Sequence, residues 1–184
     1  LAAIVVLVVV AGALIGWNIY LQQSKKVEPA SVDKMAYPLP EKPSIAVLPF
    51  DNLSGDPEQE YFSDGFTEHI ITSLSKVPYI FVIARNSTFA YKGKAVKINQ
   101  IAEELGVRYV LEGSIQRSND SLRITVQLID AISGHHLWAE NYDRKLKDIF
   151  ALQDEISMKI MAELQVNIAY ESHGRYATIK TKNL

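Results

Sequence analysis

Apolar and polar residues follow three patterns along this chain, and each pattern predicts a different kind of element. From residue 45 to residue 50 the chain is almost continuously apolar, which is typical of a short strand covered on both faces. After a polar loop, an apolar residue returns at every fourth position, which predicts a helix with one buried stripe. The residues of that stripe are Phe62, Phe66, Ile70 and Leu74. Asp56 and Pro57 predict the start of this helix, with Ser63 as the alternative because Gly65 weakens its interior.

The middle of the chain then changes from a helical period to a period of two. Residues 79–85 predict a second buried strand, and residues 99–106 predict a short helix that ends at Gly106. The segments 107–117 and 122–130 alternate between apolar and polar residues, and only a four-residue turn separates them. They therefore predict two strands of a β-hairpin.

A turn at residues 133–134 leads into a third strand, and the chain closes with a long amphipathic helix. The apolar residues that predict this helix are Ile149, Leu152, Ile156, Ile160, Leu164 and Ile168. The predicted order is β-α-β-α-β-β-β-α. The expected fold class is therefore α/β, with a mixed β-sheet flanked by helices.

Two further segments precede this domain, which we expect to occupy residues 44–170. Residues 1–21 are LAAIVVLVVVAGALIGWNIYL, and no polar side chain occurs before Asn18. A helix of this length spans about 31 Å, so we expect one transmembrane helix, with the core of a cleaved signal peptide as the alternative. Residues 22–43 hold four of the seven prolines and predict an extended linker. Because the chain starts at Leu1, we expect it to be part of a longer protein.

Charge and composition exclude several classes of function. The formal net charge is -2, with 19 basic and 21 acidic residues, so the domain is not expected to bind nucleic acid through a basic face. The chain has no cysteine, which excludes disulfides, thiolate catalysis and cysteine-bound zinc.

The segment SGHHLWAENYDRKL, residues 133–146, contains the residue types of a metal site or an acid/base site. Neighbouring residues of a strand point to opposite faces, so His135 and His136 are not expected to hold one ion together. We expect four residues to share one face and to form a cross-strand ladder, namely His136, Trp138, Glu140 and Tyr142. No metal site is predicted here.

Other catalytic patterns are also missing from the sequence. Gly93 and Lys94 do not form a phosphate loop, because no glycine precedes them at the required spacing and Ala95 replaces the magnesium-binding hydroxyl. The chain contains no Gly-x-Ser-x-Gly motif. We therefore predict no catalytic residues and no cofactor.

Four long stretches of the chain resemble a known domain family. They are SIAVLPFDNLSGDPEQEYFSDGFTEHIITSLSKV, VIARNSTFAYKG, IAEELGVRYVLEGSI and LIDAISGHHLWAENYDRKLKDIFALQDEI. Together they are similar to the TolB amino-terminal-like domain of bacterial membrane-anchored signalling proteins, over residues 43 to about 168. The sequence departs from the family pattern at His69, where an acidic residue is more common, and at His135.

The resemblance implies a domain order for the whole protein. In this family the domain commonly follows a single membrane helix, with a nucleotide cyclase or a winged-helix domain on the cytoplasmic side. Tetratricopeptide repeats usually come after the domain, so residues 171–184 would be a linker towards a missing helical repeat region. By this resemblance the chain is a single-pass protein of the bacterial inner membrane with residues 44–184 in the periplasm.

The function implied by the resemblance is that of a non-catalytic sensing or protein-interaction module outside the cytoplasm, coupled to a cytoplasmic output domain. Other protein domains are its expected partners, together with the membrane, and no small-molecule ligand can be named. The alternatives are the regulatory part of a membrane-bound adenylate or guanylate cyclase and a structural docking domain of the envelope.

A candidate binding site follows from the predicted order of strands and helices. In open α/β sheets, ligands tend to bind beyond the carboxyl ends of the strands. Two loops of this chain are expected at such ends, and turn chemistry alone is the competing explanation for their residues. The candidate residues are Asp51, Asn52, Ser54, Gly55, Asp56 and Asp64 in the first loop and its helix, and Arg85, Ser87 and Thr88 in the second.

Overall fold

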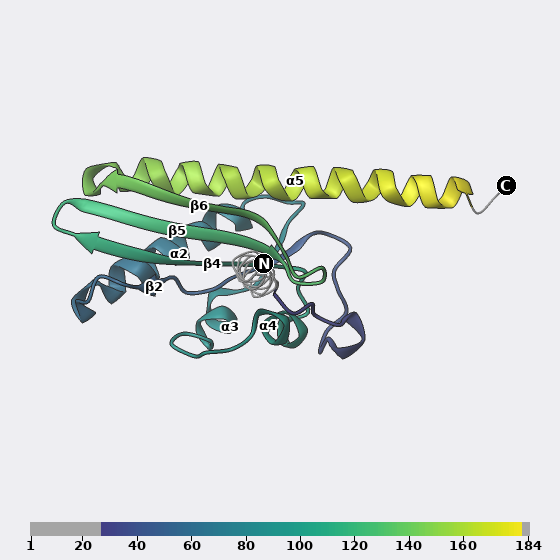
Figure 1. The fold of residues 1–184 in the computed structure, drawn as a ribbon, viewed down its shortest axis with the longest axis horizontal. Coiled ribbons are helices and arrows are strands. Elements are labelled where there is room, and N and C mark those ends of the chain that lie inside the picture. The colour runs from purple at the N-terminus through teal and green to yellow at the C-terminus, as the bar shows by residue number, and fades with distance from the viewer. Residues whose placement is uncertain (1–26, 182–184) are drawn as a thin grey trace, which may run out of the picture.

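The computed structural model describes residues 27–181 of the chain, with side chains up to residue 165. In this part, strands form one mixed sheet in the order β3-β1-β4-β5-β6, and a short β2 also pairs with β4. β1 is parallel to β3 and β4, and β2 is parallel to β4. β4, β5 and β6 follow one another as antiparallel neighbours (Figure 1). The strands are β1 Ser44–Val47, β2 Asp51–Asn52, β3 Phe81–Val82, β4 Tyr109–Ser118, β5 Ser121–Asp130 and β6 His135–Lys145.

The helices cover the sheet on both faces and form two apolar clusters with it. Residues of α2 and α5 pack against one face, together with Ile45 and Val47 of β1. Residues of α4 pack against the other face, together with Ala46 and Leu48. The apolar run that starts at residue 45 therefore forms a strand buried on both faces, as predicted. The helices are α2 Glu60–Ser75, α3 Arg85–Phe89, α4 Ile98–Leu105 and α5 Ile149–Thr181.

The start of α2 follows the predicted capping chemistry. The Asp56 carboxylate accepts a hydrogen bond from the Glu58 amide at 2.9 Å, and Pro57 opens a short 3-10 turn that runs directly into α2. Asp56 and Pro57 therefore begin the helical segment as predicted, although α2 itself starts at Glu60, and the alternative start at Ser63 is wrong. Gly65 is tolerated in the helix because it lies on the exposed side, with open space around it.

The β4–β5 hairpin also forms where the sequence predicts it. Ser118 pairs with Ser121, and Asn119 at the turn has a positive φ of 53°, which asparagine tolerates better than most residues. Along β5 the apolar residues of alternate positions are buried, and Arg123 between them is exposed. This burial confirms the predicted two-residue period.

One glycine of β4 allows a large aromatic ring to lie against the sheet. A Cβ on Gly113 would lie 2.4 Å from the Phe50 ring and 2.4 Å from the Thr125 carbonyl oxygen. Phe50 is almost fully buried and packs against the Phe66 ring of α2, with 5.1 Å between the ring centroids. The absence of a side chain at residue 113 thus makes room for the Phe50 ring between β4 and α2.

α5 closes the larger apolar cluster. Ile149, Leu152, Ile156, Ile160 and Leu164 are buried there, as predicted, whereas the side chain of Ile168 lies outside the described residues. The helix lies beside β6 and continues beyond the body of the domain (Figure 1).

The predicted fold class needs two corrections. It included a transmembrane helix, but no helix formed by the described residues combines the length and apolar character needed to cross a membrane. The stretch to which that helix was assigned, residues 1–21, lies outside the part that the structure describes. The order of elements also differs, since β2 follows β1 and α3 precedes α4.

The strand predicted at residues 79–85 is wrong in its length and burial. Only Phe81 and Val82 pair with β1, and Phe81 is 47% exposed because β3 is the last strand at this edge of the sheet. Directly after it, residues 85–89 form α3, where the sequence predicted a loop. The segment has no apolar periodicity from which a helix could have been predicted.

Candidate binding cleft

The first predicted loop is held together by its own side chains. The Asn52 amide group donates a hydrogen bond to the Asp56 carbonyl at 2.8 Å and accepts one from the Ser54 amide at 3.0 Å. The Ser54 hydroxyl oxygen accepts a hydrogen bond from the Arg117 amide of β4 at 2.9 Å, and Gly55 has a positive φ of 74°. These contacts give the loop its shape and attach it to the sheet, so turn chemistry accounts for most of its polar residues.

The second predicted group is also engaged inside the domain. The Arg85 guanidinium lies 3.7 Å from the centroid of the Phe89 ring and 3.4 Å from the Glu68 carboxylate. Thr88 is buried and its hydroxyl donates a hydrogen bond to the Arg85 carbonyl at 3.0 Å. The Ser87 amide bonds to the Ala84 carbonyl at 3.0 Å. α3 is thus stabilised locally, and these residues do not line the cleft described next.

A cleft of about 340 Å³ lies beside the first loop, between the end of β1 and the turn at residues 91–96. We call it the β1 cleft. Its apolar lining includes Leu48, Val96 and two residues of α4, Ile98 and Ile101. The charged and polar groups that line it are Asp51, Tyr91, Lys92, Lys94 and Glu112. Of the nine candidate residues predicted from the sequence, Asp51 is the one that lines this cleft.

The charges of the β1 cleft are partly neutralised by neighbours. The Lys92 ammonium lies 2.5 Å from the Asp64 carboxylate and 2.9 Å from that of Glu60. Burial opposes the charge on Lys92, but the two hydrogen-bonded carboxylates outweigh it and raise the pKa of Lys92. Asp64 therefore acts on the cleft indirectly, by fixing the position of Lys92.

Glu112 and Tyr91 have shifted proton affinities. Burial, reinforced by the negative charge of Asp51, raises the pKa of the Glu112 carboxyl above its ordinary value. Burial and a 2.5 Å hydrogen bond to Glu104 raise the pKa of Tyr91 to about 12, so the phenol stays a donor at neutral pH. The arrangement combines an apolar wall with a few oriented polar groups, which is the usual character of a ligand-binding pocket.

Four polar residues of the cleft are not among the candidates predicted from the sequence, namely Tyr91, Lys92, Lys94 and Glu112. For Glu112 a signal was present, because it is the single charged residue in the apolar strand segment YVLEGSI. Tyr91 and Lys94 lie in a turn whose approach to β1 depends on the fold, so their position could not be predicted.

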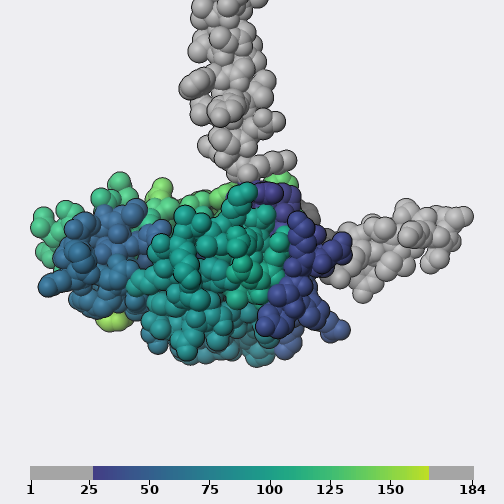
Figure 2. Space-filling model, turned by 90° about the horizontal axis from the view of Figure 1, so that it is seen from below, coloured from purple at the N-terminus to yellow at the C-terminus, as the bar shows by residue number. Residues whose placement is uncertain are grey.

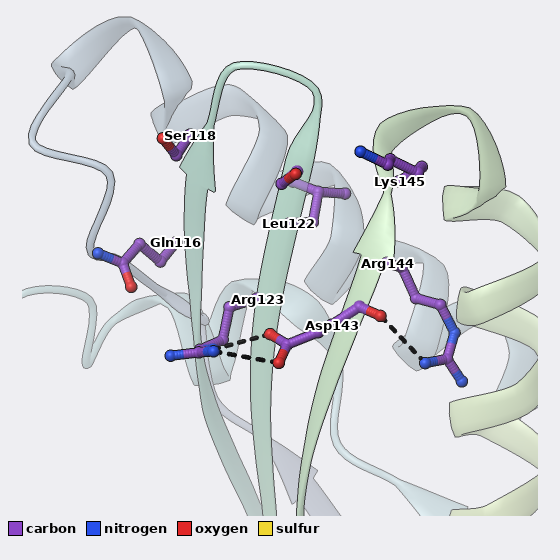
Figure 3. A pocket seen from close by; sticks show the side chains of 8 residues that line it. Gln116, Ser118, Leu122, Arg123, Asp143, Arg144 and Lys145 are labelled. Atoms are coloured by element: carbon purple, nitrogen blue, oxygen red, sulfur yellow. Dashed lines mark hydrogen bonds and ion pairs between the residues drawn. The ribbon is translucent and has the colours of Figure 1, made fainter.

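A second, larger groove of about 520 Å³ lies at the tip of the β-hairpin, between β4, β5 and β6 (Figure 3). The Arg123 guanidinium binds both oxygens of the Asp143 carboxylate across the strands, at 2.7 Å and 3.1 Å. Arg144 bonds to the Asp143 carbonyl oxygen and lies 3.4 Å from the Glu155 carboxylate of α5. These charged side chains are thus paired with partners on the same sheet or on α5.

The histidine-rich segment forms β6, but its faces differ from the prediction. A register shift between Leu128 and Ile129 pairs Trp138 with Leu128 and His136 with Ile129. Residues paired across two strands share a face of the sheet, and neighbouring residues of one strand do not. His136 and Trp138 therefore lie on opposite faces, and the predicted shared face is wrong for His136. The remaining three residues share a face, but the hydrogen bonds between them run along β6 and not across strands, because the Glu140 carboxylate accepts from Trp138 and Tyr142 of the same strand, at 3.0 Å and 3.1 Å.

Within the described part of the chain, no three histidine or acidic residues lie close enough together to hold a metal ion. The described residues form an α/β domain with a partly apolar cleft at the end of β1 and a larger groove at the tip of the hairpin.

Comparison with known proteins places this domain in a family. Residues 41–159 match the family described as the second domain of HilA/YgeH-like transcriptional regulators, and the chain belongs to this family. A protein of Rhizobium meliloti (strain 1021) named "Putative adenylate cyclase 3" is 64% identical over 130 residues. These residues are 71% of this chain and 22% of that protein, so the chain spans about a fifth of the relative's length.

Solved structures with a similar fold include TolB from Acinetobacter baumannii, with a TM-score of 0.50 and 21% identity over 71% of this chain and 30% of that one. For lipoprotein GNA1162 from Neisseria meningitidis the TM-score is 0.47, with 17% identity over 65% and 96% of the two chains. For the LpoB C-terminal domain from Escherichia coli it is 0.44, with 16% identity over 62% and 92%.

The resemblance to TolB predicted from the sequence is confirmed for the fold. The order of neighbouring domains that the resemblance implied stays a prediction.

Proposed function

We propose that residues 41–159 form a non-catalytic interaction module that senses a ligand or partner and controls an output domain elsewhere in a longer protein. The observation that carries this proposal is the family match to the second domain of a regulator. A domain that recurs as one part of longer proteins has its effect through their other parts. The relative that is 64% identical supports the same view, since it is much longer than the matched region.

The geometry of the β1 cleft supports binding more than chemistry. The residues that line it include no serine, threonine or histidine, which are the common nucleophiles and bases of hydrolytic sites. Its most buried carboxyl group, that of Glu112, is on β4, whose backbone is paired with β5 in the sheet. Such a pocket can distinguish ligands without changing them.

The output that we propose first is a nucleotide cyclase, because a relative with high identity carries that name. Control of transcription is the second candidate, because the family description names transcriptional regulators. In both cases this domain would regulate the output and would not perform it.

The experiment uses the full-length protein that contains this chain. Ala95→Trp places a large side chain in the β1 cleft, and Ala162→Trp places the same side chain on the exposed surface of α5 as a control. We expect Ala95→Trp to change cyclic nucleotide levels, or expression of a dependent promoter, by at least about fivefold, the usual size of an allosteric effect. If neither output differs from that of Ala162→Trp, the module does not act through this cleft.

We further propose that the module works outside the cytoplasm. The support lies in the sequence, where residues 1–17 carry no polar side chain, as in segments that direct export. Reporter enzymes fused after residue 45 test the proposal. A fusion with alkaline phosphatase should be active and a fusion with β-galactosidase inactive, and the reverse result would contradict this placement.

A further inference from the structure

The segment that leads into the domain lies firmly against it. We call residues 27–37 the strap. The Ala30 amide donates a hydrogen bond to the Ala131 carbonyl at 2.7 Å, and Ala30 is buried in the smaller apolar cluster. The Ser31 amide bonds to the Glu103 carboxylate at 2.8 Å, and the Ala36 amide bonds to the Glu103 carbonyl at 2.8 Å. In Figure 2 the purple atoms of this segment lie against the teal part of the domain.

Two glycines permit this close approach. A Cβ on Gly134 would lie 2.1 Å from the Val27 carbonyl oxygen, and a Cβ on Gly106 would lie 2.8 Å from the Tyr37 backbone. Both glycines have positive φ, 69° and 63°, so each also makes a turn that other residues disfavour. The β5–β6 turn and the end of α4 are therefore both shaped to receive the strap.

α4 is shared between the strap and the β1 cleft. Glu103 of α4 bonds twice to the strap, and Lys97, at the start of α4, lies 2.8 Å from the Glu28 carboxylate. Ile101 of the same helix lines the cleft and packs in the apolar cluster that includes Ala30. Glu104, also on α4, accepts a hydrogen bond from the cleft residue Tyr91.

We propose that α4 couples the β1 cleft to the strap, so that a molecule bound in the cleft loosens the contacts of the strap with the domain. This inference rests on the proposed sensing function and adds its route. Ile101 both lines the cleft and belongs to the apolar cluster that contains Ala30. Because protein interiors are closely packed, a molecule that enters the cleft and displaces Ile101 must disturb the packing around Ala30.

The test uses the whole chain and the absence of native cysteine. Ala95→Cys introduces one thiol into the cleft, and N-ethylmaleimide then fills the cleft covalently, with complete reaction checked by mass spectrometry. Hydrogen exchange is measured at the amides of Ala30, Ser31 and Ala36, each of which bonds across to the domain. We expect these amides to exchange at least about fivefold faster after labelling, the lower end of ordinary allosteric coupling.

The control is Ala162→Cys with the same reagent, on the opposite side of the sheet. Exchange at Leu111 and Ile124 of the sheet should stay unchanged in both proteins, which shows that the fold is intact. If the strap amides of labelled Ala95→Cys exchange within twofold of the labelled control, the coupling does not exist.

A reciprocal measurement covers the case in which the label unfolds the domain. Glu103→Ala removes the carboxylate that holds Ser31, and because equilibrium coupling is reciprocal, a loosened strap should also alter the exposure of the cleft. The unlabelled thiol of Ala95→Cys should then react with N-ethylmaleimide at a changed rate, by at least about threefold. Glu41→Ala, at an exposed residue that lies between the strap and β1, should not alter the rate. Equal rates in the three backgrounds would overturn the proposal.

These results are separate from those that test the proposed function. The exchange and labelling measurements need no output domain and no natural ligand. If the strap responds while cyclic nucleotide levels and transcription do not, the coupling stands and the sensing function fails. If the outputs respond but the strap does not, the function stands and the route through α4 is wrong.

Discussion

At the scale of single residues, Glu112 shows how burial and charge act together in the β1 cleft. Its carboxyl is half-buried in β4 and faces the negative charge of Asp51, so its pKa lies above the ordinary value of 4.5. The folded state therefore binds this proton more tightly than the unfolded state does. Between the two pKa values stability falls as the pH rises, and the loss persists above the folded pKa.

Glu112→Gln should remove the loss of stability that ionisation of the Glu112 carboxyl causes. We expect a higher free energy of unfolding than that of the wild type at about pH 7, and no difference at about pH 3, where both side chains are neutral. Urea denaturation at the two pH values measures the effect. Asp51→Asn should give a smaller gain of the same sign, because it removes only the neighbouring charge. A less stable Glu112→Gln protein at pH 7 would contradict the interpretation.

Gly113→Ala tests the contact between β4 and Phe50. The added methyl group would overlap the Phe50 ring and the Thr125 carbonyl. We therefore expect the free energy of unfolding to fall by about 1 to 3 kcal/mol, as in other overpacked cores. Gly65→Ala in α2 is the control, because its methyl group meets open space and alanine favours a helix by about 0.5 to 1 kcal/mol. The two variants should thus shift the thermal unfolding midpoint in opposite directions.

At the scale of elements, α5 combines two kinds of helix surface. Its buried stripe completes the larger apolar cluster, while Phe150 and Met158 are 75% and 62% exposed. A helix that served only as the first half of a downstream repeat would leave the buried stripe open. The structure instead places that stripe on the sheet and α2.

Ile160→Ala should therefore destabilise the domain by about 2 to 5 kcal/mol, the usual cost of truncating a buried isoleucine. Met158→Ala shortens an exposed apolar side chain of the same helix and should change stability by less than about 0.5 kcal/mol. Chemical denaturation of the whole chain compares the two. Equal midpoints for Ile160→Ala and the wild type would show that α5 is not part of the core.

At the scale of the whole molecule, the strap is part of the segment that the sequence predicted as an extended linker. In the structure it contacts two distant parts of the domain. The Ser31–Glu103 hydrogen bond connects residues 72 positions apart. Such a contact contributes to stability only after the sheet and α4 have formed, because both of its surfaces are made by the fold.

Gly134→Ala should release the strap. The methyl group would collide with the Val27 carbonyl. We therefore expect Gly134→Ala to lower the free energy of unfolding by at least about 1 kcal/mol more than Gly93→Ala does. Gly93 also has a positive φ, 68°, but open space around it, so its substitution reports backbone strain alone. Thermal unfolding measures both costs, and hydrogen exchange at Ala30 should accelerate only in Gly134→Ala. Equal costs would show that the strap is not held at this turn.

The sequence allowed the paired strands, α2, α4, the closing helix and their turns to be predicted, because each has a local pattern. A buried stripe recurs with the helical period, and Gly106 ends α4 in the left-handed conformation that glycine adopts easily. The shortened β3 and the unpredicted α3 lacked such a pattern. The division into residues 22–43, 44–170 and 171–184 stays a prediction.

For the candidate site the sequence determined the residue types but not their neighbours. Asp51 could be predicted because a strand end followed by a polar loop is visible locally. Glu112 stands out in the sequence as the single charged residue of an apolar strand, but its place beside Asp51, like that of Lys92, could not be predicted. Strand pairing and helix packing bring Lys92 and Glu112 to Asp51 from 41 and 61 positions away. The same holds for His136 in β6, where a register shift against β5 reverses the face that simple alternation predicts. Side-chain periodicity follows from local backbone geometry, whereas clefts, register and strap contacts arise only when distant segments pack.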